Sequence, residues 1–165
     1  MRKSYIVSAK RTAIGSFLGG LATVKPKDMG SAVVKALLED ANVAPENVDE
    51  VICGNVLGAG LGQNIGRTIA LEAGIPETVC AHSVNMVCGS GLRTVMEAVM
   101  SIQCGFNDIV VAGGVESMSG APYLIPANTR TGNKMGNFTV VDHMIYDALT
   151  DARAEIHMGV TAENI

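Results

Sequence analysis

Cys88 is the residue of this sequence best placed to do chemistry, because it stands between a strand-like run and a helix-like run. A turn of this kind exposes a side chain at the end of a sheet, as the nucleophile elbow of hydrolases does. A thiol at a helix N-terminus meets unpaired N–H groups and the positive end of the helix dipole, which favour its thiolate. Gly89 and Gly91 allow close approach of a substrate, and the same N–H groups suit a developing oxyanion. The segment therefore predicts a nucleophilic cysteine, and a buried structural cysteine is the alternative.

The other thiols and the imidazoles lack such a setting. Three cysteines lie in strand-like runs or at a helix end, and we expect them to fill the core. They are Cys53, Cys80 and Cys104. The sequence has no C-x-x-C pair, and its three histidines do not cluster with cysteines at the spacing of zinc sites. We therefore expect no metal site.

The glycine-rich stretch at residues 58–62 has the sequence GAGLG and follows a strand-like run. A dinucleotide-binding fingerprint needs G-x-G-x-x-G and an acidic residue about 20 positions further on. Here the third glycine comes one position early, residue 63 is glutamine, and no such acidic residue ends a following strand. A flexible turn is the better interpretation.

Strand-like and helix-like segments alternate along the first 115 residues. Strands are predicted at residues 5–9, 51–57, 79–87 and 108–115. Helices are predicted from an N-cap at Asp28 to residue 41, over 64–73, and from Cys88 or Gly89 to a C-cap at Gly105. This alternation predicts a layered α/β fold with a largely parallel sheet and helices on both faces.

The amino-acid composition changes after Glu116. Residues 117–142 are rich in Ser, Pro, Asn, Thr and Gly, a helical piece is predicted over 141–149, and Thr161 is a candidate N-cap for a last helix. We therefore expect one domain at residues 1–117 and the beginning of a second, loop-rich one at 118–165.

Composition excludes several function classes. The chain has 165 residues, of which 48% are hydrophobic and 17% charged, so it is not a disordered segment. The net charge of −4 and the scarcity of aromatic residues (4%) argue against nucleic acid as a partner. No secretory signal or membrane-spanning run is visible, so a reducing cytoplasmic location with free thiols and no membrane partner is expected.

At this point the residues carry a family resemblance. The segment VNMVCGSGL at 84–92 resembles the acylation signature of the thiolases. Further similar segments occur in the family's order along the whole chain: AKRTAIG at 9–15, QN at 63–64, GGVESMS at 113–119 and HMGVTAEN at 157–164. The resemblance implies a thiolase-like α/β/α fold with a mixed, largely parallel sheet. CGSG in place of CSSG resembles the biosynthetic, acetoacetyl-CoA-forming type.

The resemblance also implies a mechanism. Cys88 would take the acyl group of acetyl-CoA, and a second acetyl-CoA deprotonated at its α-carbon would attack it, giving acetoacetyl-CoA and free coenzyme A. The reverse direction is thiolysis. Covalent catalysis divides one hard step into two. The coenzyme A thioester is the substrate, and no separate cofactor is implied. The backbone N–H of Cys88 would be one oxyanion donor, and Glu116 and Asn85 would support the site by hydrogen bonds.

Three residues match family positions that line the pantetheine and acyl pocket, namely Leu149, His157 and Met158. Ordinary alternatives are a leucine on a helix face, a surface or capping histidine, and a core methionine. Residues 120–142 resemble the family's tetramerisation loop, which implies a homo-oligomer, dimeric or tetrameric. The family resemblance as a whole implies a role in fatty acid metabolism. The run at 79–87 is expected near the dimer interface, since a long apolar strand edge invites pairing.

One departure from the family is large. Thiolases are much longer and consist of two similar halves, and their catalytic histidine and second cysteine lie in the second half. The chain therefore resembles the first half only, with the C-terminal half absent, and we expect it to be inactive alone. A degradative 3-ketoacyl-CoA thiolase, another condensing enzyme of the superfamily, and a non-catalytic acyl-CoA-binding homologue remain open.

Overall fold

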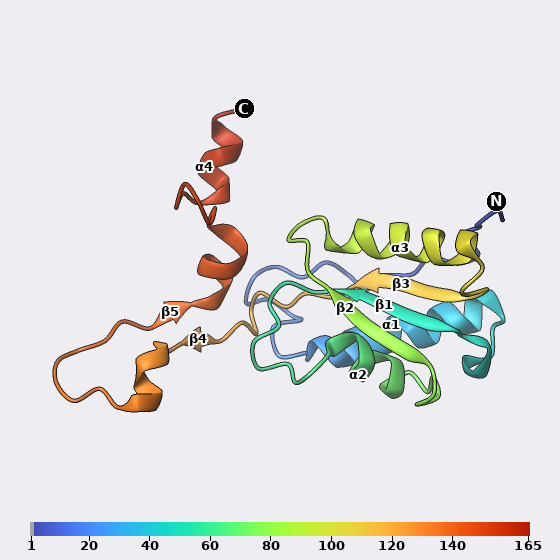
Figure 1. Cartoon of the computed structure of the whole chain (residues 1–165), viewed down its shortest axis with the longest axis horizontal. Coiled ribbons are helices and arrows are strands. Elements are labelled where there is room, and N and C mark those ends of the chain that lie inside the picture. Colours follow the sequence, from blue (N-terminus) through green and yellow to red (C-terminus); the bar gives the residue numbers. More distant parts are fainter. Residues whose placement is uncertain (1) are drawn as a thin grey trace.

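A three-stranded parallel sheet forms the centre of the computed structural model, which describes residues 2–165 (Figure 1). Its strands are β1 (Glu50–Gly54), β2 (Cys80–Val84) and β3 (Val110–Gly114), in the order β2-β1-β3. Gly54 at the end of β1 lies opposite Val84 on one side and Gly114 on the other, so all three strands end at the same edge. The expected layered α/β fold with a largely parallel sheet is confirmed.

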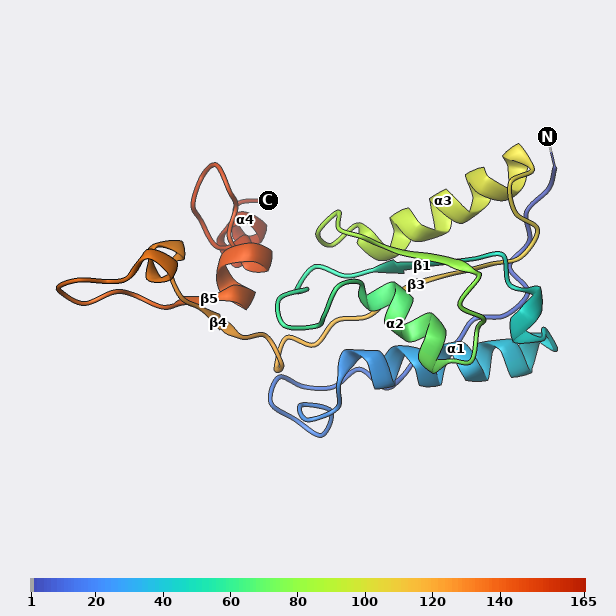
Figure 2. The same cartoon turned by 60° about the horizontal axis from the view of Figure 1, so that its bottom comes forward.

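Helices cover both faces of this sheet, as Figure 2 shows. Helices α1 (Pro26–Ala41) and α2 (Ile65–Glu72) lie on one face and α3 (Ser90–Cys104) on the other. The chain order explains this. The connection from β1 to β2 runs in one direction along the sheet, and the connection from β2 to β3 returns across β1. Because both crossovers are right-handed, their helices must lie on opposite faces.

Helix α1 begins three residues earlier than the sequence predicts. Its N-cap is Lys25, Pro26 occupies the first helical position, and Asp28 lies within the first turn, so the expected N-cap at Asp28 is wrong. Proline suits the first position because its fixed φ matches the helix and its missing N–H is not needed there. Asn42 ends the helix in the left-handed region at φ 51°. The predicted cap at Gly105, with φ 79°, is confirmed for α3.

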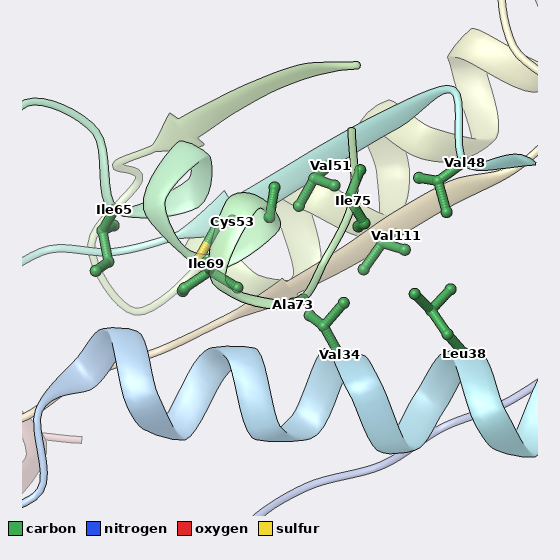
Figure 3. Packing of buried hydrophobic residues seen from close by; sticks show 11 residues of the cluster. Val34, Leu38, Val48, Val51, Cys53, Ile65, Ile69, Ala73, Ile75 and Val111 are labelled. Carbon is green, nitrogen blue, oxygen red and sulfur yellow. The ribbon is translucent and has the colours of Figure 1, made fainter. Parts of the chain in front are cut away.

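The main hydrophobic core lies between the sheet and the α1–α2 layer (Figure 3). It also includes the segment around the short 3-10 helix η1 (Pro45–Asn47) and the turn after α2. Its members are Val34, Leu38, Val48, Val51, Cys53, Ile65, Ile69, Ala70, Ala73, Ile75 and Val111. Burying one such aliphatic side chain contributes about 1.5–3 kcal/mol, so this cluster is the main source of the fold's stability.

Three strand predictions need correction, and one of them is the strand expected over 51–57, which is too long because β1 ends at Gly54. Residues 5–9 form no strand, and Tyr5, Ile6 and Val7 are 74%, 82% and 75% exposed. A strand needs a ladder partner as well as propensity, and this segment is instead tied to α1 through bonds from Ser8 and Lys10 to Asp40.

The strand predicted over 79–87 is also too long, since β2 ends at Val84. The Asn85 side chain accepts a bond from the Val87 N–H, and this local turn competes with the ladder.

The chain after residue 117 extends away from the sheet (Figure 1). It contains β4 (Tyr123–Leu124) paired antiparallel with β5 (Val141–Asp142), the 3-10 helix η2 (Ala127–Thr131), the π-helical segment η3 (Met144–Leu149) and α4 (Met158–Glu163). The helical piece predicted over 141–149 thus begins as a strand. The last helix begins at Met158 rather than after Thr161, because His157 supplies its cap.

None of the helices within residues 2–165 has the length and apolar character needed to cross a membrane.

Candidate functional site

The site is built on the edge of the sheet where its three parallel strands end. Asn55 follows β1, Asn85 follows β2, and Glu116 lies two residues after β3. In open α/β sheets, ligands bind beyond the carboxyl ends of the strands. The chemistry-bearing residues of three separate segments therefore meet at the edge where a substrate is expected.

Cys88 lies on the turn from β2 into α3, and its side chain is exposed. The N–H groups of Gly89 and Ser90 donate to the carbonyls of Met86 (3.1 Å) and Val87 (3.1 Å). These two N–H groups, which are among those expected to suit an oxyanion, are therefore not free for one. The Cys88 N–H itself donates to no acceptor within residues 2–165. Among the N–H groups from Met86 to Ser90 in the described chain, it is the one that remains available to a ligand.

Packing against the sheet fixes the start of α3. A Cβ added to Gly54 would lie 2.8 Å from the carbonyl carbon of Ser90 and 2.9 Å from the nitrogen of Gly91. Only glycine allows β1 to approach the first turn of α3 so closely. One turn later, the buried Thr94 hydroxyl lies 2.8 Å from the carbonyl of Gly91 and 3.1 Å from that of Gly113. The helix that carries Cys88 is thus tied to both β1 and β3.

Glu116 connects the end of β3 with the loop after β1. Its carboxylate accepts bonds from the Asn55 side-chain amide (2.9 Å) and from the backbone N–H groups of Val56 (2.9 Å) and Leu57 (3.0 Å). Asn55 also donates to the Val115 carbonyl at 3.1 Å. Glu116 is a hydrogen-bonding support in this structure, as expected. Asn55 was missed by sequence reasoning, and its position directly after a buried strand is the signal that could have found it.

Leu149, His157 and Met158 come together at the far end of the chain. Thr150 and His157 form an isolated antiparallel bridge, which brings the residues next to them side by side. Leu149 and Met158 are half-buried and His157 is exposed. The His157 Nδ1 accepts the Gly159 N–H at 3.0 Å, so this side chain caps α4. The three residues lie on the segment that extends away from the sheet (Figure 1).

The remaining cysteines differ from one another. Cys53 is buried in the core, and burial, with a smaller contribution from the charge of Glu116, raises the pKa of its thiol to about 11. Cys80 and Cys104 are exposed, so the expectation that they fill the core is wrong. Cys80 begins the edge strand β2 and Cys104 ends α3, and both positions lie at the margin of the packed layers.

His143 is a second residue that the sequence did not single out. It is only 6% exposed, and its ring pairs through Nδ1 with Asp147 on η3. Its Nε2 accepts the Ala59 N–H at 3.4 Å. Ala59 belongs to the glycine-rich turn, where Gly60 and Gly62 adopt left-handed φ values of 78° and 95°. The predicted turn is thus confirmed, and His143 joins it to η3.

Three cavities of about 230, 430 and 330 Å³ lie elsewhere, and Cys88 lines none of these three. Within residues 2–165, Cys88 is therefore presented on a surface rather than enclosed. Such an arrangement exposes a nucleophile and one unpaired N–H to a partner molecule or to a further part of the protein.

Comparison with known proteins gives the family. The model of the thiolase N-terminal domain matches residues 4–165. An acetyl-CoA acetyltransferase of Escherichia coli is 51% identical over 165 residues, which are 100% of this chain and 42% of that protein. One of Chromobacterium violaceum is 54% identical over 160 residues, covering 97% of this chain and 41% of the relative. A mouse protein named acetyl-CoA acetyltransferase, cytosolic, is 54% identical with similar coverage, 97% and 40%.

The chain spans about two fifths of the length of these curated relatives. The match extends over nearly all of its residues and includes the Cys88 turn, the Glu116 segment and the region of His157. The chain belongs to the thiolase family, and residues 4–165 are a thiolase N-terminal domain.

Proposed function

We propose that the protein containing this chain is an acetyl-CoA acetyltransferase, which condenses two acetyl-CoA into acetoacetyl-CoA and coenzyme A in a reversible reaction. The names of relatives at 51–54% identity support this activity. The observation that carries the proposal is the exposed thiol of Cys88, in a turn from Met86 to Ser90 in which each described N–H group except that of Cys88 has an acceptor.

Cys88 is the nucleophile in this proposal. Its sulfur forms a bond to the carbonyl carbon of the thioester while the bond from that carbon to the coenzyme A sulfur breaks. The proton lost by the thiol ends on the coenzyme A that leaves. The Cys88 N–H stabilises the negative charge that develops on the carbonyl oxygen, because it is a preorganised donor beside the attacking atom.

Carbon–carbon bond formation completes the reaction. The α-carbon of a second acetyl-CoA loses a proton and attacks the acetyl group on Cys88. The bond between the acetyl carbon and the Cys88 sulfur breaks, and the thiol recovers a proton. Leu149, His157 and Met158 contribute to the pocket for the pantetheine and acyl groups, since Leu149 and Met158 offer half-buried apolar surface next to the backbone bridge of Thr150 and His157.

Further catalytic groups lie outside these 165 residues. An activated nucleophile needs a base within hydrogen-bond reach, and no histidine or carboxylate is hydrogen-bonded to the Cys88 sulfur within the described chain. We therefore expect the 165-residue chain alone to show no measurable thiolysis of acetoacetyl-CoA. Turnover at an ordinary enzyme rate by the purified chain would contradict this.

Replacement of cysteines in the complete protein tests the activity. Thiolysis of acetoacetyl-CoA should fall more than about a thousandfold in Cys88→Ser, as expected when a covalent nucleophile is removed. Cys104→Ser is the matched control, because Cys104 is also exposed but lies at the other end of α3. Equal activities of the two variants would refute the role of Cys88. Acetoacetyl-CoA binding without any turnover in the wild type would favour a non-catalytic acyl-CoA-binding protein.

We further propose a homo-oligomer, dimeric or tetrameric, whose dimer contact includes β2. This strand is at the edge of the sheet, with one side unpaired in the described chain. Unpaired strand edges favour association with another strand. Cys80→Lys places a charge at an exposed position of this edge and should shift the complete protein toward monomer in sedimentation velocity. Unchanged sedimentation would argue against this contact.

A further inference from the structure

The turn that presents Cys88 contains a backbone conformation that its sequence disfavours. Val87, directly before Cys88, has a φ of 49°. A β-branched residue in the left-handed region is a true outlier, since its Cβ crowds the neighbouring backbone. Such conformations persist only where the surroundings hold them, and they cluster at functional sites. The left-handed conformation of Val87 therefore requires stabilising contacts from its neighbours.

The Ser90 hydroxyl bonds to both ends of the strained stretch. It accepts the Met86 N–H at 2.9 Å and donates to the Val87 carbonyl at 2.6 Å. Ser90 is only 5% exposed, so water does not readily replace these bonds. One buried side chain thus satisfies a donor before Val87 and the acceptor of Val87 itself.

Ser90 is itself held from behind. Its backbone packs against Gly54 of β1 at a distance that leaves no room for a Cβ on Gly54. Its N–H donates to the Val87 carbonyl, so that carbonyl accepts two bonds from the same residue. The position of the Ser90 hydroxyl is therefore fixed by the packing of its backbone on β1, and the hydroxyl in turn holds the turn before it.

We infer that Ser90 is a positioning residue for acyl transfer, which holds the Val87 turn so that the Cys88 sulfur and the unpaired Cys88 N–H face the same thioester carbonyl. The inference rests on the proposed function. Without the hydroxyl, the Met86 N–H loses its partner and Val87 relaxes from its left-handed conformation. Because Cys88 follows Val87 directly, that relaxation rotates the Cys88 sulfur and the Cys88 N–H so that they no longer face the same thioester carbonyl.

The geometry has different consequences for two reactions of the same thiol. Acetylation by acetyl-CoA needs the sulfur and the N–H donor together, and small misplacements in such a step cost up to about a hundredfold in rate. Alkylation by iodoacetamide has no tetrahedral oxyanion and needs only the exposed thiolate. Loss of positioning therefore separates the two rates, whereas partial unfolding changes both.

The test is made on the complete protein with Ser90→Ala. Acetylation of Cys88 by acetyl-CoA, followed by rapid quench and peptide mass spectrometry, should slow by about 10–100-fold. Alkylation of Cys88 by iodoacetamide should change less than about threefold. Thr94→Val is the matched control, because it removes a buried hydroxyl one turn later on α3 that does not bond to the Cys88 turn. It should leave the ratio of the two rates at the wild-type value.

A second variant addresses the strain itself. Glycine adopts a φ of 49° freely, so in a Val87→Gly background the hydroxyl is needed less. Ser90→Ala should then slow acetylation by less than about threefold, and such non-additivity is the sign of coupled residues. Equal slowing of both reactions by Ser90→Ala, or an unchanged acetylation rate, would overturn the positioning role while leaving the proposed function intact. A wild-type protein that takes no acetyl group on Cys88 would overturn both.

Discussion

The sheet body, residues 26–114, and the loop region, residues 118–165, belong to one chain but are held together in different ways. The sheet body has paired parallel strands, three helices of 8 to 16 residues and a shared apolar core. The loop region has two-residue strands and short helical segments, and His143 is its one buried residue in the described chain. Packing dominates the first region, and local hydrogen bonds dominate the second.

This difference separates the two groups of candidate site residues. Cys88 is positioned by a helix that packs on β1 and β3, so its location is fixed by packing against the sheet. Leu149, His157 and Met158 are positioned by one bridge and one cap. Regions with few buried contacts open locally at little free-energy cost. We therefore expect the thiol to be rigidly held and the three residues proposed for the acyl pocket to be mobile before substrate binds.

The largest effect should come from matched truncations of isoleucine in the two regions. Ile75 is 2% exposed in the core, and Ile75→Ala should lower the free energy of unfolding of the complete protein by about 2–5 kcal/mol. Ile145 on η3 is 39% exposed, and Ile145→Ala should cost below about 1 kcal/mol. Urea unfolding measures both. Similar losses would show that the loop region is packed as tightly as the sheet body.

A smaller effect is expected from glycines of the sheet body. A Cβ on Gly66 at the start of α2 would lie 2.5 Å from the His82 carbonyl oxygen of β2, so Gly66→Ala must move backbone. We expect a loss of about 1–3 kcal/mol. Gly113 on β3 has no atom within 4 Å of an added Cβ, and Gly113→Ala serves as control. If both variants unfold at the same urea concentration, the close approach of α2 to β2 is not a constraint.

Local opening of the loop region is the next effect. His143→Ala removes the ring that joins Ala59 to Asp147. Hydrogen exchange of the η3 amides should accelerate, while that of the β1 amides should stay at the wild-type rate, because β1 is held by the core. Faster exchange in both elements would mean that His143 supports the whole fold.

The smallest effect is a dependence on pH in the loop region. The N–H groups of Ala154 and Arg153 bond to the Asp151 carboxylate and lower its pKa. A lowered pKa means that this contribution to stability is full above the ordinary range near 3.8 and is lost as the pH falls through the lowered value. Exchange of these two amides should therefore rise in acid, relative to the β1 amides.

Asp151→Asn provides the control for that measurement. It keeps the shape of the side chain but has no carboxylate to protonate, so the additional acid dependence of these two amides should disappear. A variant that keeps the full dependence would assign it to another group.

Much of the sheet body follows from local sequence. Alternating apolar runs predict β1, β3, α1 and α3, and the glycine-flanked Cys88 stands at the predicted junction. The predictions from sequence fail where a partner distant in the chain determines the local structure. Residues 5–9 have strand propensity but no ladder, and Asp40, more than thirty positions away, holds Ser8. No local pattern contains that information.

The site shows the same limit. Cys88 is recognisable because its own neighbours create its setting. Asn55 and His143 are not recognisable, because their roles depend on Glu116 and Ala59, which are distant in sequence. Thr161, a common N-cap residue followed by helix formers, is the cap that the sequence predicts for the last helix, whereas His157 provides it in the structure.

In the proposed reaction, Cys88 is the thiol that takes the acyl group. The most direct measurement is brief exposure of the complete protein to acetyl-CoA, followed by digestion and mass spectrometry of all four cysteine peptides. We predict one acetyl group on the Cys88 peptide, none on those of Cys53, Cys80 and Cys104, and protection of Cys88 from iodoacetamide in step with acetylation. An acetyl group on another cysteine, or wild-type activity in Cys88→Ala, would contradict the claim.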